Sequence, residues 1–588
     1  MHDRRLVAGG AAIALGVLAI IGLVVMAPRW SVAGLDALAQ QKLGRSVSVR
    51  GGTHLDFSPL SIRLDDAVLS GPQAGDDSFV TAKSAVIPVT LGELLAGRAD
   101  PSTLALSEPE IALLIDERGR ANWDFPGFSL GKPMRVTLDQ ASFRYFDERN
   151  SQSMALGHVD GVLDLREDGG AAFSGTAVIN DRLVKVDADL KSLARVNADG
   201  SPLELALSAN EGAGNFSGRL STAKVLSLAG PVSLASDTPA AALRLAGLPL
   251  PPAATVSGPL AIDGALDSAG RAYSIRNATL SLGAFRAVGD IAADLRADVP
   301  KLQASLNADT LWLDGLVPAS GAADGNWGRV PLPFAVLRGT DAELRIQARS
   351  LAYGNVRAGA ADVNATLKDA KLDATIEAQQ EGTGTLNVTL GVDAGSAPPG
   401  VSLNIQSVNA AVQPLLGVLT GVRGLTGTGD LTADLSASGT TQEELAGTLK
   451  GTASIGVANG RIAGIDLAAL FQAVRQKILD GWPPAAEGTP FDNLNGDATI
   501  ADGIVTFREL SLEAPSLSVR LEGIVDVLRQ GLNVSASAAV NGQPLLAVPV
   551  VARGLWGSPK IFPDVPNILA NPEGGFARLQ DMSPLQGN

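Results

Sequence analysis

From Ser46 almost to its end, the chain alternates apolar residues with polar or small ones. This period of two is typical of β-strands with one buried face, and Gly, Pro or Asp residues that favour turns bound each segment. The segments include Val47 to Val49, Leu55 to Phe57, Ile111 to Ile115, Leu183 to Leu190, Thr279 to Leu282, Ile291 to Leu295, Leu386 to Leu390, Val401 to Ile405 and Leu517 to Leu521. No fixed sequence period links them, which excludes a β-solenoid with one short motif per coil. The pattern therefore predicts a mainly β protein built as a long antiparallel meander.

The alternation also sets the size of the predicted sheet. At roughly 18 to 22 residues per strand and turn, the chain beyond its N-terminal segment would form about 25 to 30 strands and extend on the order of 120 to 140 Å. Two apolar faces could close on each other as sandwich domains, or one sheet could curl along its length and leave an apolar groove. The alternation alone does not choose between these two architectures.

Helical patterns interrupt the strands at few places. Leu91 to Ala96 fits one or two turns, and Asn409 to Val422 carries four apolar residues at helical spacing. Asp466 to Leu479 is the clearest amphipathic helix, with its first residue as N-cap. Thr441-x-x-Glu444 fits a capping box for a short helix, although chance in a polar turn explains it equally well. After Pro563 the chain is rich in Pro, Gly and Asn, which predicts a loose tail.

One long apolar run precedes the strands. Leu6 to Ala27 holds 22 consecutive apolar or glycine residues, and a helix needs about 20 to cross a bilayer. A buried helix of a soluble domain would show a polar stripe, which this run lacks. A cleavable signal peptide has a shorter apolar region; Val25 to Ala27 fits a cleavage site loosely, but Pro28 is a poor start for a cleaved product. We therefore expect an uncleaved transmembrane helix.

Charge predicts the topology of this helix. Arg4 and Arg5 lie on its N-terminal side, so residues 1–5 should stay cytoplasmic while the body is translocated, which in a Gram-negative cell means into the periplasm. The expected localisation is the inner membrane, crossed once. Trp30 to Leu43 then fits a short amphipathic helix at the outer membrane face, with a plain buried first helix as the alternative.

Composition narrows the classes of partner. The net charge is −15, the pI is about 4.8 and no basic run is present, which argues against a nucleic-acid partner. The absence of cysteine excludes disulfides, thiolate metal sites and a cysteine nucleophile. Charged residues make up only 18% and the mean hydropathy is +0.19, so the body is unusually apolar. Proteins, lipids and small molecules remain as partners.

Candidate catalytic motifs do not fit their required contexts. Gly127 to Gly131 matches G-x-S-x-G, but prolines flank it and no helical pattern follows, as a nucleophile elbow requires. His54 and His158 lie alone in strand patterns, without a histidine at metal-binding spacing. The pairs Asp65-Asp66 and Asp76-Asp77 fit solvated loops better than a metal site. No Walker or dinucleotide glycine pattern occurs, so we expect no catalysis, cofactor or metal.

Several glycines predict turns. Asn-Gly and Asp-Gly pairs favour tight hairpins because these turns need positive φ, and they occur at 459–460, 495–496 and 502–503. Gly44, Gly119 and Gly464 fit chain reversals or helix ends better than ligand contacts. Trp123 fits a core position better than a binding platform.

Short motifs recur in one order at the two ends of the chain. At the N-terminal end they are Leu43-Gly44-Arg45, Phe57-Ser58-Pro59-Leu60, Leu91 to Arg98, Glu108-Pro109-Glu110-Ile111 and Gly119-Arg120-Ala121-Asn122-Trp123. At the C-terminal end they are Gly447 to Gly451, Ala458 to Leu467, Phe491 to Phe507 and Val548 to Lys560. This ordered series resembles the AsmA family of inner-membrane-anchored envelope proteins. Residues from about 170 to 400 are similar only in texture.

The resemblance implies a division of the body and a fold. It indicates an N-terminal β module at 28–170, a middle β meander at 171–400, a C-terminal module at 401–563 and a loose tail at 564–588. AsmA relatives are similar to bridge-like lipid transfer proteins with repeating β-grooves. The expected fold class is thus mainly β: a long antiparallel meander forming an elongated curled groove, a few short helices and one N-terminal transmembrane helix.

The resemblance also implies a function. AsmA relatives are implicated in outer-membrane biogenesis, so we expect a non-catalytic conduit or carrier for membrane phospholipid along an apolar groove. Leu280, Leu282, Ile291 and Leu295, which alternate in two neighbouring predicted strands, are the candidate groove residues. The alternative is an anchored periplasmic scaffold or assembly factor for outer-membrane proteins. The expected partners are phospholipid, the inner membrane and envelope proteins.

Overall fold

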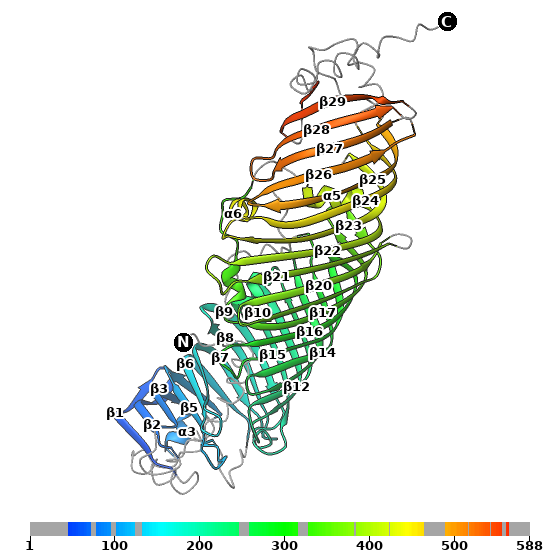
Figure 1. Cartoon of the computed structure of the whole chain (residues 1–588). Helices are drawn as coiled ribbons and strands as arrows, with labels where there is room; N and C mark the ends of the chain where they lie inside the picture. The colour runs from blue at the N-terminus through cyan, green and yellow to red at the C-terminus, as the bar shows by residue number, and fades with distance from the viewer. Residues whose placement is uncertain are drawn as a thin grey trace. The chain divides into compact units, whose positions relative to one another are not determined.

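The computed structural model describes residues 45–71, 78–95, 102–123, 132–245, 258–314, 327–380, 384–420, 422, 424–463, 488–515, 517–540, 543–555 and 560–563. The chain divides into two compact units, Met1–Arg296 and Ala297–Asn588, and each is considered by itself. Thirty strands are assigned in the described residues, with a few short helices between them (Figure 1). The predicted mainly β meander is therefore confirmed, at the upper end of the expected number of strands.

The described residues of unit 1 form strands β1 to β15 and two short helices. The strands are β1 (Val47–Phe57), β2 (Leu60–Leu69), β3 (Val80–Pro88), β4 (Thr103–Ser107), β5 (Glu110–Ile115), β6 (Met134–Asp147), β7 (Gln152–Leu165), β8 (Ala171–Ile179), β9 (Arg182–Leu190), β10 (Ser201–Ala209), β11 (Gly212–Ser221), β12 (Ser227–Ser236), β13 (Leu260–Ala269), β14 (Ala272–Leu282) and β15 (Phe285–Asp294). The helices are α3 (Leu91–Leu95) and α4 (Pro239–Leu245).

Most strands of unit 1 pair with their neighbours in sequence. β1, β2 and β3 are antiparallel, and β6 to β15 form an antiparallel meander in chain order. Between them, β4 and β5 both pair with β3 on one side and lie parallel to β6 on the other. The break between β4 and β5 falls at Glu108, whose φ is +47°, and Pro109, which has no N–H to donate.

The motifs at the N-terminal end hold this region together. Asn122 takes the place of a missing strand beside β5, because its side chain accepts from the Leu114 amide and donates to the Ala112 carbonyl, both at 2.9 Å. The buried Arg45 donates to the carbonyl oxygen of Asn122, and its guanidinium lies 4.8 Å from the centre of the Phe79 ring. These motif residues therefore stabilise the fold of the N-terminal region.

Two expectations for this region are confirmed. Gly119 has φ +79° and lies in the reversal that follows β5, so its conformation is the reason for the glycine. Trp123 is 4% exposed, and its ring centre lies 6.2 Å from that of Tyr145. It is a core residue, as predicted.

Arg149 forms a buried ion pair with Asp147 and connects distant parts of unit 1. Arg149, in the turn after β6, donates from Nε and Nη2 to the two carboxylate oxygens of Asp147, at 2.9 and 2.8 Å. The same guanidinium donates to the carbonyls of Thr222 and Ala223, both at 3.0 Å, in the turn between β11 and β12. Asp147 is fully buried. The sheet thus curls until the turn after β6 meets the turn after β11.

Unit 2 contains strands β16 to β30. They are β16 (Lys301–Trp312), β17 (Asp341–Tyr353), β18 (Val356–Ala358), β19 (Ala361–Lys368), β20 (Lys371–Gln379), β21 (Thr385–Asp393), β22 (Gly400–Ala411), β23 (Leu425–Ser438), β24 (Lys450–Ile462), β25 (Thr489–Ala501), β26 (Ile504–Glu513), β27 (Leu517–Asp526), β28 (Gly531–Val540), β29 (Gln543–Leu555) and β30 (Lys560–Pro563). The helical elements are η1 (Phe334–Leu337), α5 (Val412–Thr420) and α6 (Gln442–Gly447).

The pairing in unit 2 begins with one parallel pair. β16 is parallel to β17, which pairs on its other side with β18 and β19. From β19 to β30 every strand is antiparallel to the next. The described strands of each unit form one series of neighbours, so the alternative of two separate stacked sheets is not seen in them.

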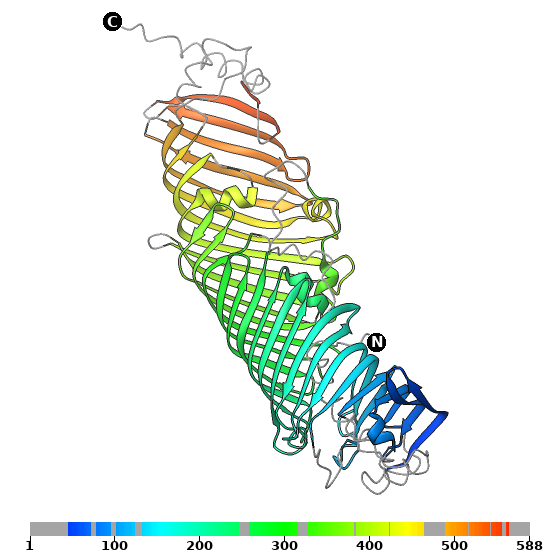
Figure 2. The same ribbon diagram turned by 180° about the vertical axis from the view of Figure 1, so that it is seen from behind.

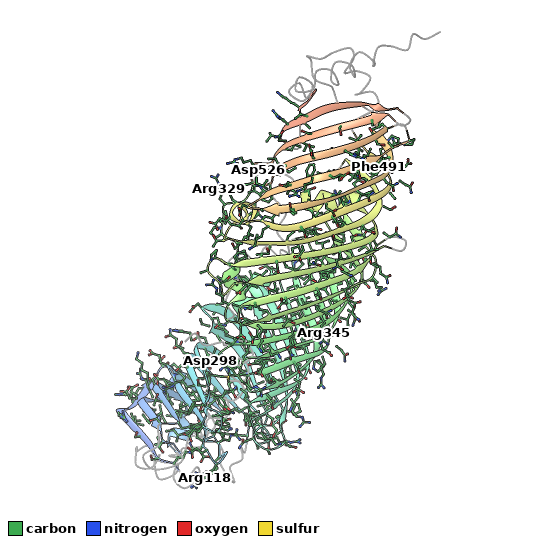
Figure 3. The ribbon with its side chains drawn as sticks, in the orientation of Figure 1. Arg118, Asp298, Arg329, Arg345, Phe491 and Asp526 are labelled. Atoms are coloured by element: carbon green, nitrogen blue, oxygen red, sulfur yellow. The ribbon has the colours of Figure 1, made fainter. Side chains whose placement is uncertain are left out.

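The connection from β16 to β17 follows one margin of the unit 2 sheet. Its residues 327–340, here called the rim segment, contact successive turns of that margin. The contacts are Arg338 Nε to the Ala394 carbonyl (2.9 Å), the Leu332 amide to the Thr440 carbonyl (2.7 Å), Arg329 to Glu443 (2.6 Å) and Trp327 Nε1 to the Val527 carbonyl (3.0 Å). Figure 3 shows Arg329 and Asp526 at this margin and Phe491 at the opposite one. The rim segment ties together turns that are far apart in sequence.

β-Bulges recur in both units with one design. At each, a residue with φ near +50° is added to one strand, and its amide donates to an aspartate of the next strand. The pairs are Gln140 with Asp160 (2.7 Å), Asn277 with Asp290 (2.9 Å) and Asn409 with Asp430 (2.8 Å). A bulge leaves an amide without its ladder partner and increases the local twist, so the aspartate satisfies a group that the bulge exposes.

The turn predictions are only partly right. Asp502 and Gly503, with φ of +47° and +73°, form the hairpin between β25 and β26, as expected. The prediction at 459–460 is wrong, because Asn459 uses its φ of +49° at an irregularity inside β24. The prediction at 495–496 is also wrong: Gly496 lies inside β25, where a Cβ would meet Leu510 Cδ1 at 2.4 Å. Bulges and close packing require the same residues as hairpins.

The helix predictions are confirmed where they can be compared. The expected turn at 91–96 is α3, the expected helix at 409–422 is the shorter α5, and the capping box precedes α6. Thr441 Oγ1 accepts from the Glu444 amide at 3.1 Å, while the Glu444 carboxylate reaches the Thr440 amide at 2.6 Å.

Other predicted segments lie outside the described residues. They are the transmembrane helix at 6–27, the amphipathic helix at 30–43, the helix at 466–479 and the tail at 564–588. In the portion that is described, no helix has the length and apolar character needed to cross a bilayer. The predicted reach and the module boundaries at 170 and 400 also stay predictions.

The Asp147–Arg149 pair should be important for the stability of unit 1. Replacing Asp147 with Asn leaves a largely buried guanidinium without its charge partner. We therefore expect the free energy of unfolding to fall by about 3 to 5 kcal/mol. The measurement is urea unfolding of the full-length protein in detergent, followed by circular dichroism. Asp164→Asn is the matched control, because Asp164 pairs with Arg135 at 2.6 Å but is 44% exposed, and it should change little. Equal losses in both variants would contradict the assigned role.

Candidate functional site

The four candidate groove residues share one face of unit 1. Leu280 and Leu282 lie two residues apart in β14, and Ile291 and Leu295 have the same parity at the end of β15. Across the ladder, Leu280 pairs with Ile262 and Ala287, Leu282 with Leu260 and Phe285, and Ile291 with Ile275. The face is therefore continuous over three strands. The first two residues lie near the β14–β15 turn, and the other two lie toward the opposite margin.

The side chains of this face are partly accessible. All four candidates are half-buried, as are Ile262, Ile275 and Phe285 beside them. Tyr273 is on the same face, and burial raises the pKa of its hydroxyl, with Arg271 opposing the shift, so the group is neutral at physiological pH. The face consequently presents aliphatic and aromatic surface without a formal charge from Tyr273.

Unit 2 carries an apolar face that is longer and more regular. Three rows of side chains cross the sheet, each built from residues that are register partners on successive strands. The Ile346 row is Leu306, Ile346, Val363, Ile376, Val388, Ile405, Ala433, Ala453, Ala498, Phe507, Gly523, Val534 and Ala552. No polar residue interrupts this row over thirteen strands.

The two flanking rows have the same character. The Leu344 row is Ala304, Leu344, Ala365, Ala374, Leu390, Leu403, Leu435, Gly451, Ile500, Val505, Val525, Leu532 and Gly554. The Ala348 row is Ala308, Ala348, Ala361, Ala378, Leu386, Ser407, Leu431, Ile455, Gly496, Leu510, Leu521 and Ala536. Ser407 is its one polar member. Most large side chains of the Leu344 row, including Leu390, Leu403 and Leu435, are half-buried.

The opposite face of unit 2 is polar along the same strands. The row one residue away from the Ile346 row is Arg345, Asn364, Thr375, Thr389, Asn404, Asp434, Thr452, Thr499, Thr506, Ile524, Asn533 and Arg553. Arg345 is exposed. Cross-strand threonine pairs stabilise such a face while it stays solvated. The sheet is thus two-sided, with one apolar and one polar surface.

Helix α5 covers part of the apolar face. Val412 and Leu415 of α5 are buried, and they belong to one cluster with Val457, Leu494 and Leu512, which share the parity of the Ala348 row. Figure 2 shows the helix lying against the strands from this side. Toward the margin that carries the rim segment, Leu390, Leu403 and Leu435 of the Leu344 row are half-buried. The accessible apolar surface is thus bounded on one side by α5.

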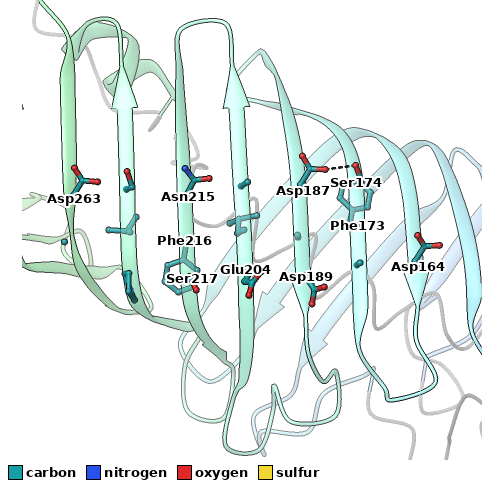
Figure 4. Close-up of a pocket in the computed structure, with 18 residues that line it drawn as sticks. Asp164, Phe173, Ser174, Asp187, Asp189, Glu204, Asn215, Phe216, Ser217 and Asp263 are labelled. Atoms are coloured by element: carbon teal, nitrogen blue, oxygen red, sulfur yellow. Dashed lines mark hydrogen bonds between the residues drawn. The ribbon is translucent and has the colours of Figure 1, made fainter.

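A depression of about 880 Å³ lies over strands β7 to β13 of unit 1 (Figure 4). Register places Asp189 beside Glu204, and Asp187 two residues away on the same strand, so these carboxylates share one face of the sheet. The Ser174 hydroxyl donates to Asp187 at 2.6 Å and holds the pKa of that carboxyl below its usual value, as does Lys185. No cluster of His, Asp or Glu among the described residues could hold a metal ion. This face is a solvated surface with local ion pairs.

The histidines and acidic pairs lie apart from one another. His54 in β1 is 54% exposed at its side chain and contacts Asp65 at 3.2 Å, while His158 lies in β7 with φ +52°. Asp65-Asp66 was expected in a loop, but the pair lies inside strand β2. Asp66 has a positive φ there. Gly127 to Gly131 and Asp76-Asp77 lie outside the described residues.

Most of the apolar face was not predicted from the sequence. The predicted candidates are four residues of unit 1, whereas the longest uninterrupted row passes through Ile346, Ile376 and Val388 in unit 2. Alternation within each strand marks these residues as inward-facing. It does not say which residue of the next strand lies beside them, and that information comes only from the register.

Comparison with known proteins agrees with the motifs that lie between Gly447 and Phe507. Residues 322–510 match the model of the AsmA family; they include the whole rim segment, the strands from β17 to β25 and most of β26. Protein AsmA of Escherichia coli (strain K12) is 23% identical over 269 residues, which cover 41% of this chain and 43% of that protein. The alignment thus spans less than half the length of this relative. No solved structure matches the chain significantly. Residues 322–510 thus carry the AsmA family match, and the chain is similar to protein AsmA over part of its length.

Proposed function

We propose that this protein is a non-catalytic conduit or carrier for phospholipid, whose acyl chains lie along the apolar face of the curled sheet as along a groove. The observation that carries the proposal is the Ile346 row, which offers thirteen strands of apolar surface without a polar interruption. The match to the AsmA family over residues 322–510 supports a role in the cell envelope. Each methylene that leaves water for such a face gains about 0.8 kcal/mol.

The length of the apolar rows suits a path for several lipids better than a pocket for one. At a strand spacing of about 4.8 Å, the Ile346 row extends for roughly 60 Å. One leaflet of a bilayer core, and hence one acyl chain, measures about 15 Å. A pocket for a single ligand would end after three or four strands, whereas this row continues past them.

The proposal includes a place in the cell. An uncleaved helix at residues 6–27 would hold the body at the inner membrane, and the charges of Arg4 and Arg5 would direct the body into the periplasm. Outer-membrane biogenesis then supplies a use for phospholipid carried away from the inner membrane. The competing function, a scaffold for outer-membrane proteins, needs no accessible apolar face.

The paired variant Leu280→Asp with Leu282→Asp should remove bound phospholipid. Two carboxylates on the half-buried apolar face would repel acyl chains, while the partial exposure of both positions should let the sheet fold. We expect several-fold less phospholipid to copurify with the full-length protein, measured by mass spectrometry, with an unchanged circular dichroism spectrum. Thr279→Asp with Ser281→Asp places the same charges on the polar face of the same strand and should keep the lipid. Equal lipid content in both double variants would favour the scaffold.

A photoreactive residue should report the same contrast in unit 2. Placed at Leu403, it would lie within the Leu344 row and should crosslink to phospholipid in membranes of living cells. Placed at the adjacent Ser402, which is exposed on the polar face, it should give several-fold less lipid adduct. The measurement is the yield of radiolabelled phospholipid on the isolated protein. Comparable yields at both positions would show that the apolar face does not select for lipid.

A further inference from the structure

We infer that the apolar face of unit 1 is blind at its N-terminal end, and that acyl chains reach it only at strands β12 to β15. The inference rests on the proposed function and specifies where the substrate gains access. A single row of register partners records the change from closed to accessible. It runs through Val186, Leu207, Gly214, Leu234, Ile262 and Leu280.

The N-terminal strands enclose a filled core. In β9, Val184, Val186 and Leu190 are exposed by 2% or less, and Leu163 of β7 and Ile179 of β8 are fully buried. A packed protein core has no space for a methylene chain without displacing side chains. The apolar residues of these strands therefore stabilise the fold and are closed to ligand.

The closure has a structural cause. Arg149, in the turn after β6, donates to the carbonyls of Thr222 and Ala223 in the turn after β11, so opposite margins of the curled sheet meet. The fully buried Asp147 fixes the guanidinium that makes this contact. Opening the core at this point would break both of these hydrogen bonds.

The accessible part begins where this closure ends. Leu207, Leu234, Ile262 and Leu280 belong to the same row as Val186 but are all half-buried. In β13 and β14 the large aliphatic side chains at both ends of the face, such as Leu260 and Ile275, are also half-buried. The change occurs within a few strands of one continuous sheet (Figure 1). Lipid arriving from the direction of β6 would meet packed side chains, so acyl chains can reach this face only at the later strands.

Single cysteines can test this inference because the natural chain contains none. We would compare Leu163→Cys and Val186→Cys in the enclosed core with Leu234→Cys and Leu280→Cys on the accessible part. The full-length protein in detergent is treated with a maleimide that carries a dodecyl chain, and the rate of modification is followed by mass spectrometry. Modification after denaturation confirms that each thiol is competent, and circular dichroism confirms each fold.

The expected result is modification at least about tenfold faster at the two accessible positions, because an enclosed thiol reacts only through local opening of the core. Vesicles of phosphatidylethanolamine and phosphatidylglycerol should slow the reaction at Leu280→Cys, since phospholipid competes for the same surface. If all four positions were modified at equal rates and vesicles still slowed the reaction at Leu280→Cys, the inference of a blind end would be wrong. The proposed function would still stand. No competition, together with no copurifying lipid, would remove the proposed function and this inference with it.

Discussion

Strand register is the constraint on which both apolar faces depend. Side chains alternate between the two faces of a sheet, so a slip of one residue in any pairing would move the aliphatic side chains of that strand to the polar face. In unit 2 the Ile346 row and the polar row beside it keep their parity from strand to strand. Burial of apolar surface at about 25 cal/mol per Å² favours one side, and solvation of threonine and asparagine favours the other. Each strand is thereby held in register by both of its faces.

Bulges are where this parity would be expected to fail, and the sequence compensates for them. At four bulges the inward residues are three apart in place of two, and the pair between them faces outward. The inward pairs are Leu138 and Ala141, Ile275 and Ala278, Ser407 and Ala410, and Phe507 and Leu510. The outward residues are polar except Val408, which is consequently 54% exposed. The apolar face continues through each bulge because the sequence skips one extra residue at that point.

This skipping explains both the success and the limits of prediction from sequence. Alternation identifies the strands and their number, and it assigns Leu280, Leu282, Ile291 and Leu295 to one face correctly. It does not reveal that Asn459 belongs to a strand, because positive φ is required equally by a hairpin turn and by a bulge. The aspartates that accept from bulge amides, such as Asp290 and Asp430, resemble ordinary surface residues until the neighbouring strand is placed. Interactions between residues close in sequence can be predicted from the sequence, whereas interactions between strands cannot.

The contacts made by Arg149 and by the rim segment are the most remote from prediction. Arg149 joins turns more than seventy residues apart, and Trp327 bonds to Val527 across two hundred residues. Neither contact leaves a local pattern, yet both control how far a sheet can open or curl. The apolar face of unit 1 is closed where Arg149 acts, and the unit 2 sheet is tied along one margin by the rim segment. Accessibility of an apolar face is therefore set by a few long-range polar contacts at its margins.

A long apolar row differs from a deep pocket in how a ligand would move along it. A pocket surrounds its ligand and holds it in one deep minimum, whereas conduction needs binding that is favourable enough to admit the ligand and weak enough to release it. On the Ile346 row each strand presents nearly the same chemistry, so a methylene that leaves Val388 for Ile405 exchanges one aliphatic contact for another. The small residues at Ala433, Ala453 and Ala498 change the depth of the surface but not its polarity. The free energy of an acyl chain would consequently vary little from strand to strand, which is the condition for movement along the sheet without catalysis.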